Sequence, residues 1–142
     1  MSFGFSVGDF VAVGNLCWTV YKRCKDSSGN YKELSNEVGA LHNVIKETEE
    51  LLSQQQLSPE QKSKLDLSRS GCEGILQDLD KLLAKYEGLG TKSQRTFDRM
   101  GFGMQNMNSI RTRLISNVTL LDTFNNVYNQ PIYQFMNPIG PH

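Results

Sequence analysis

The side chains best able to do chemistry in this sequence are three cysteines and two histidines. Cys17, Cys24 and Cys72 show no paired spacing, and His42 and His142 are widely separated from each other in the chain. A zinc site needs clustered Cys and His ligands, and a disulfide framework needs a denser, even set of cysteines. We therefore expect no metal site, no cofactor and no disulfide. We interpret the cysteines as small buried hydrophobic residues of a cytoplasmic protein.

A glycine-containing loop and a run of carboxylates are the remaining candidates for a reactive site. Residues 88–93 superficially resemble a phosphate-binding loop, but they lack its Gly-Lys-Ser/Thr order and its upstream glycine. The end of a helix followed by a linker explains them better. Glu47, Glu49 and Glu50 form an acidic patch for a partner, although a run of charges is usually a solvated helix face. Since no base or nucleophile is positioned for catalysis, we expect no enzyme and no small-molecule substrate.

Composition narrows the class of partner. The 142 residues include 15 Lys plus Arg and 15 Asp plus Glu, so the chain has no net charge. A balanced charge does not draw a whole molecule to nucleic acid, and we expect no nucleic-acid binding. The hydrophobic content of 38% is typical of a globular domain. No run of about 18 apolar residues predicts a constitutive transmembrane helix.

Apolar residues recur at steps of three and four in four segments, which predicts four amphipathic helices. The first runs from about residue 6 to residue 25, and the turn cluster 26–30 ends it. Gly14 in its middle lowers helix propensity by about 1 kcal/mol relative to Ala, so something other than propensity must keep it there. The predicted apolar faces comprise Phe10, Val13, Cys17, Val20 and Cys24 in the first segment, Tyr31, Leu34, Val38, Leu41, Ile45, Thr48 and Leu52 in the second, Leu65, Cys72, Ile75, Leu79, Leu82 and Tyr86 in the third, and Met104, Met107, Arg111, Leu114, Val118, Leu121 and Asn125 in the fourth.

The third segment has the clearest signals for its two ends. Ser58 suits the N-cap, Pro59 suits the first helical position, and Gln61 stands where a capping box has its reciprocal partner. Gly88 and Gly90 are expected to end this helix.

Four helices that cannot bury their apolar stripes alone predict an all-α antiparallel four-helix bundle over residues 1–128. One extra short helix fits around residues 93–100. Residues 129–142 contain three prolines and no Asp, Glu, Lys or Arg, which predicts an irregular tail. We interpret this tail as a surface strap, because its prolines argue against a stacked-strand aggregate.

Three stretches of the sequence carry a resemblance to a known family. Residues 2–13 (SFGFSVGDFVAV), residues 34–38 (LSNEV) and residues 110–121 (IRTRLISNVTLL) resemble the helical N-terminal domains of fungal STAND receptors, which are NLR-like proteins. The resemblance implies a non-catalytic signalling domain of the HeLo-like or coiled-coil type. Such a domain acts by self-association and by insertion of its N-terminal helix into a membrane, with cell death as the outcome. No nucleotide-binding region follows the helices, so we expect either an excised domain or a short protein whose trigger lies elsewhere.

The first hypothesis of function is insertion of the N-terminal helix into an anionic membrane upon activation. The residues that would enter lipid are Phe3, Phe5, Val7, Phe10, Val11, Val13, Leu16 and Trp18. A helix over residues 6–24 is about 28 Å long, close to the roughly 30 Å hydrocarbon core of a bilayer. Lys22, Arg23 and Lys25 would then hold anionic headgroups of the plasma membrane. The alternative interpretation is that the same apolar stripe forms one wall of the bundle core.

The second hypothesis is an adaptor that binds a protein partner without membrane activity. Its interaction surface would consist of the acidic residues Glu47, Glu49 and Glu50 together with the basic residues Lys92, Arg95, Arg99, Arg111 and Arg113. Opposite charges on these elements predict oriented, salt-sensitive pairing with a second copy or with a partner receptor.

Overall fold

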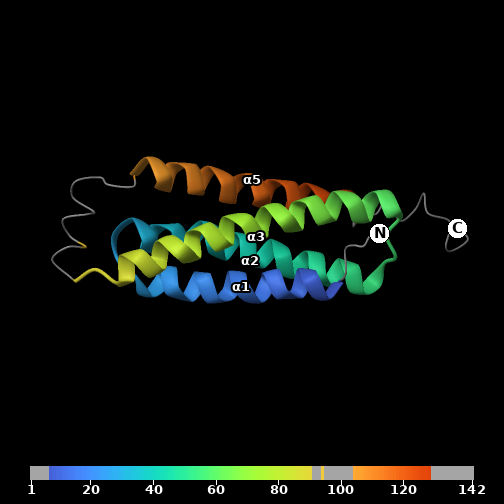
Figure 1. Cartoon of the computed structure of the whole chain (residues 1–142). Helices are drawn as coiled ribbons and strands as arrows, with labels where there is room; N and C mark the ends of the chain where they lie inside the picture. The colour runs from blue at the N-terminus through green and yellow to red at the C-terminus, as the bar shows by residue number, and fades with distance from the viewer. Residues whose placement is uncertain (1–6, 91–93, 95–103, 129–142) are drawn as a thin grey trace, which may run out of the picture.

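The computed structural model describes residues 7–90, 94 and 104–128, apart from the side chains of residues 104–106. In these ranges the regular structure is helical and comprises α1 (Val7–Asp26), α2 (Gly29–Gln54), α3 (Pro59–Glu87) and α5 (Met104–Tyr128). The helices lie side by side as long rods (Figure 1). The predicted all-α four-helix bundle is therefore confirmed. The short helix predicted around residues 93–100 falls mostly outside the described residues, and the tail 129–142 lies wholly outside them.

Successive helices run in opposite directions, but neighbours in space are not always neighbours in sequence (Figure 1). α1 packs against α2 and α3, and α5 packs against the same two helices. The order around the bundle is therefore α1, α2, α5, α3. In this order α1 and α3 are parallel neighbours, as are α2 and α5, and the connection at residues 55–58 crosses one end of the bundle. Leu57 in this connection is buried and covers that end of the core.

A single hydrophobic core runs through all four helices. The five residues predicted along the centre of the apolar face of α1 are buried, Leu16 and Tyr21, which were expected to widen it, are partly buried, and most of the residues predicted on the other faces are buried. The predicted lines were too narrow in α2 and α3: the structure also buries Val44, Leu51, Leu76 and Leu83, whereas Leu52 and Leu82 are only partly buried. The physical reason is that each helix contacts two neighbours and buries a face wider than one line of residues.

The predicted start of α3 is confirmed atom by atom. The backbone N–H of Gln61 donates to Ser58 Oγ at 3.1 Å, and the backbone N–H of Ser58 donates to Gln61 Oε1 at 2.7 Å. The helix ends at Glu87, one residue before the predicted glycine stop. The backbone oxygen of Tyr86 at this helix end accepts two hydrogen bonds, from the backbone N–H of Leu89 at 3.1 Å and from the side-chain amide of Gln94 at 2.9 Å.

The turn between α1 and α2 is shorter than the sequence predicted. α1 extends to Asp26 and α2 begins at Gly29, so only Ser27 and Ser28 lie between them. Gly29 has a φ of 59°, in the left-handed region that favours glycine. The cluster of turn-forming residues therefore marks the right place, but Gly29 and Asn30 belong to the helix.

Candidate interaction surfaces

The residues predicted to enter a membrane do not share one surface in the folded bundle. Phe10 and Val13 are buried in the core, Leu16 is partly buried, Val7, Val11 and Trp18 are exposed, and Phe3 and Phe5 lie outside the described residues. The core interpretation thus holds for the buried part of the stripe, and three exposed apolar residues remain on the outer side of α1.

Trp18 lies on the face formed by α1 and α2, where its indole is held between other rings. Its centroid is 5.3 Å from that of Tyr21 and 4.9 Å from that of His42, and Lys22 Nζ lies 5.8 Å from the indole centroid. Two causes lower the pKa of His42: its partial burial, which is the larger, and the nearby positive charge of Lys46. The expected position of His42 at the rim of its helix is confirmed, and its imidazole is mainly neutral near pH 7.

Gly14 lies where α1 approaches α2 closely, which explains its place in the middle of a helix. A Cβ atom on Gly14 would lie 2.6 Å from Glu49 Oε2 and 3.2 Å from Ile45 Cγ2. Glu49 is consequently only 16% exposed, and its Oε1 accepts a hydrogen bond from Lys46 Nζ at 3.1 Å. Of the predicted acidic patch, Glu47 and Glu50 are exposed, whereas Glu49 is not.

Arg111 and Arg113, the two predicted basic residues that the structure describes, do not lie beside the predicted acidic residues of α2. Arg111 pairs with Glu37 of α2 at 3.3 Å, and Arg113 pairs with Asp78 of α3 at 2.8 Å. Glu37 precedes the acidic residues Glu47–Glu50 by 10 to 13 positions on α2, a separation of about 15–20 Å along the helix. The other predicted basic residues, Lys92, Arg95 and Arg99, lie outside the described part of the chain.

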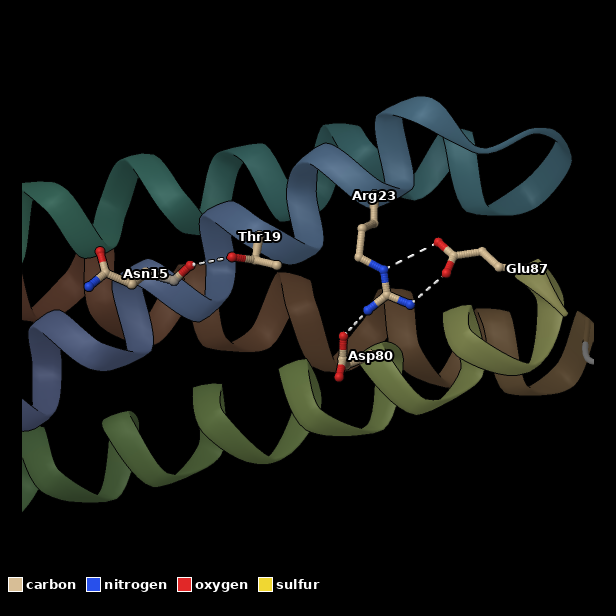
Figure 2. Close-up of polar contacts among 5 residues, drawn as sticks. All are labelled: Asn15, Thr19, Arg23, Asp80 and Glu87. Carbon is tan, nitrogen blue, oxygen red and sulfur yellow. Dashed lines mark hydrogen bonds and ion pairs between the residues drawn. The ribbon is translucent and has the colours of Figure 1, made fainter.

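The seam between α1 and α3 has a polar outer edge (Figure 2). Arg23 near the end of α1 pairs with Asp80 and forms a two-pronged ion pair with Glu87, with N–O distances of 3.2 and 2.9 Å. The hydrogen bond to Glu87 is the main cause that raises the pKa of Arg23. One turn earlier on α1, Thr19 Oγ1 donates to the backbone oxygen of Asn15 at 3.2 Å. Ion pairs therefore help to hold the end of α1 on α3.

A groove between α3 and α5, which we call the α3–α5 groove, was not predicted. Its volume is about 550 Å³, and it is lined by Lys64, Leu67, Ser68 and Gly71 of α3 and by Asn117, Leu120, Thr123, Phe124, Val127 and Tyr128 of α5. Leu67, Leu120 and Val127 are 74%, 58% and 46% exposed. These three residues lie outside the predicted apolar faces. Large apolar residues outside those faces were the feature of the sequence that could have indicated a second apolar surface.

The groove results from short side chains on α3. Ser68 and Gly71 form part of the α3 wall, so little fills the space between the two backbones. At one end of the groove α3 and α5 approach each other closely. A Cβ atom on Gly71 would lie only 2.8 Å from Asn117 Oδ1. Towards the other end the lining becomes aromatic, where the rings of Phe124 and Tyr128 pack with centroids 4.7 Å apart.

The cysteines and His42, the reactive groups that the structure describes, do not form a metal site. In residues 7–90, 94 and 104–128 no group of three or more His, Cys, Asp or Glu side chains is placed to hold a metal ion. Burial is the main cause that raises the pKa of Cys17, Cys24 and Cys72 to about 12. All three are free, buried thiols that stay protonated near neutral pH.

Within the same ranges, none of the helices combines the length and the apolar character needed to cross a membrane. No protein-family model, curated protein or solved structure matches this chain. The α3–α5 groove and the α1–α2 face are two surfaces on which large apolar side chains are exposed.

Proposed function

We propose that this chain is a non-catalytic signalling domain that acts by self-association, and that two copies meet through their α3–α5 grooves. The observation that supports the proposal is the gathering of Leu67, Leu120 and Val127 around one apolar hollow. Single exposed hydrophobic residues are ordinary, but a group around a hollow is typical of a site for protein association.

A two-fold pairing suits this surface. In such a pairing each copy contributes the same patch, so the three exposed residues of both copies leave water together. Among the described residues that line the groove, Lys64 alone is charged. Few charges would therefore have to be desolvated on association, and the free energy would come mainly from apolar burial.

Sedimentation velocity over a range of protein and salt concentrations tests the proposal. The unmodified chain is expected to associate at high concentration, and association should persist at high salt because it depends on apolar burial. Leu120→Lys should abolish it, since a charge would then lie in the contact. The matched control is Ile115→Lys, because Ile115 is on the same helix, is 51% exposed and does not line the groove. Association that both variants retain equally would contradict the proposal.

A second candidate, release of α1 towards an anionic membrane, is favoured by the polar edge of the α1–α3 seam. Arg23 is held by two carboxylates that are each more than 40% exposed, and lipid phosphates could compete with them for the guanidinium. Asn15 and Thr19 would be costly against lipid, so several copies would have to turn them inwards. Flotation and leakage assays with clustered protein test this candidate: failure to bind or permeabilise anionic vesicles would refute it.

A further inference from the structure

The α3–α5 groove reaches the end of α5, and Tyr128, the last described residue, is part of its wall. We propose that in the unassociated chain this groove is the docking site of the chain's own residues 129–142. This inference rests on the proposed function for the role of the groove. It adds that self-association must first displace an internal competitor.

The chemistry of the segment fits the groove. Residues 129–142 include Ile132, Tyr133, Phe135, Met136 and Ile139 and contain no Asp, Glu, Lys or Arg. Docking them would remove large apolar side chains from water without burying a charge from the segment. The groove offers a mainly apolar wall, and Lys64 is the one charged side chain among the described residues that line it.

The length of the segment and the place where it begins also fit. The α5 wall extends from Tyr128 back to Asn117, which is about 17 Å along a helix. An extended chain advances about 3.3 Å per residue, so about five or six residues cover that length. Pro131 cannot continue α5 with a regular hydrogen bond and favours a change of direction there. Residues 1–6 are less suited, because they precede α1, which α3 separates from the groove.

Covalent attachment gives this segment an advantage over a second copy. A tethered ligand acts at an effective concentration that is about millimolar for short flexible linkers, well above that of a free protein. The segment would therefore limit self-association until clustering or a partner displaces it.

Paramagnetic NMR on the full chain tests the inference. A nitroxide label is attached to an Asn137→Cys variant; the three native thiols are buried, with pKa values of about 12, and should not react at neutral pH. We expect methyl signals of Leu67, Leu120 and Val127 to lose most of their intensity, while those of Val11 on α1 do not. Leu120→Lys should restore the signals of the other two, whereas Ile115→Lys should not. Unchanged groove signals in the labelled chain would overturn the inference.

Mixing experiments separate this inference from the proposed function. When isotope-labelled chains without nitroxide are mixed with unlabelled chains that carry it, a segment docked in its own chain should leave the groove signals intact. Broadening in the mixture would show that the occupant is another copy and would refute internal docking. The variant Phe135→Ser should strengthen self-association severalfold, because it weakens the competitor. If Phe135→Ser leaves association unchanged while Leu120→Lys still abolishes it, the inference fails and the proposed function stands.

Discussion

At the scale of single residues, a buried polar pair sets the level at which α2 and α5 meet. Thr48 Oγ1 lies 2.9 Å from Asn125 Oδ1 and 2.8 Å from the backbone oxygen of Val44, and Asn125 Nδ2 donates to that same oxygen at 3.3 Å. Both side chains are almost fully buried. These hydrogen bonds can form only at one relative position of the two parallel helices along their axes. Purely apolar contacts would specify that position less sharply.

We predict that Thr48→Val lowers the free energy of unfolding by about 1–3 kcal/mol, because Asn125 Oδ1 loses its donor while buried. The double variant Thr48→Val, Asn125→Leu should recover most of the loss, since no polar side-chain atom then remains unpaired. Urea denaturation of the single and double variants measures both effects. A double variant less stable than the sum of its single changes would contradict this account.

His42 provides a prediction on pH. Its pKa is lowered by partial burial and by the charge of Lys46, whereas an unfolded histidine titrates near about 6.5. Between the folded and the unfolded pKa the unfolded chain binds more protons, so this residue's contribution to stability is present above the unfolded pKa and is lost as pH falls through the folded pKa. An NMR titration should give a midpoint below 6.5, and Lys46→Ala should raise it. Lys62→Ala, which removes a lysine from another helix, should not move the midpoint.

At the scale of helices, the sequence predicted best where a local rule acts. Ser58 and Gln61 form their capping box as predicted, because the donors and acceptors of its two hydrogen bonds lie within one turn of the chain. The buried face of α1 was also predicted correctly, because its apolar residues recur at one helical spacing. Val44 and Leu83 were missed, since their burial depends on which two neighbours each helix meets.

The interaction surfaces were harder to predict, because they depend on distances between helices. Nothing local distinguishes Arg113, which pairs with Asp78, from an arginine that is free to bind a partner. The α3–α5 groove arises only because Gly71 faces Asn117 across the seam and Ser68 leaves space beside it. Gly14 was noted as needing a reason beyond propensity, and the reason is Glu49 on α2.

The Arg23 ion pairs lead to a prediction for α1 as an element. Arg23→Gln should lower stability by up to about 1 kcal/mol, because the two carboxylates are well solvated. Hydrogen exchange should quicken in the second half of α1 more than in α2. High salt should reduce the difference from the unmodified chain. Arg113→Gln, which removes a more exposed single pair, is the matched control and should have a smaller effect.

At the scale of the whole molecule, the order of the helices places the two candidate surfaces on opposite sides. The face with Trp18 belongs to α1 and α2, whereas the groove belongs to α3 and α5. Copies joined through their grooves would therefore keep the α1–α2 face and its lysines accessible. Association through the grooves would then not obstruct an approach of the α1–α2 face to a membrane.

The continuity of the core predicts that the bundle unfolds as one unit. The core joins all four helices, and Trp18, the single tryptophan, lies on α1 where its fluorescence reports the α1–α2 face. Urea transitions followed by Trp18 fluorescence and by far-ultraviolet circular dichroism should coincide, since two-state unfolding gives every probe the same midpoint. The test compares the two midpoints at low and at high salt. A fluorescence midpoint at lower urea would show that α1 leaves a bundle that is otherwise intact. A gap that widened with salt would trace this weakness to the Arg23 ion pairs and would favour release of α1 over action as a rigid bundle.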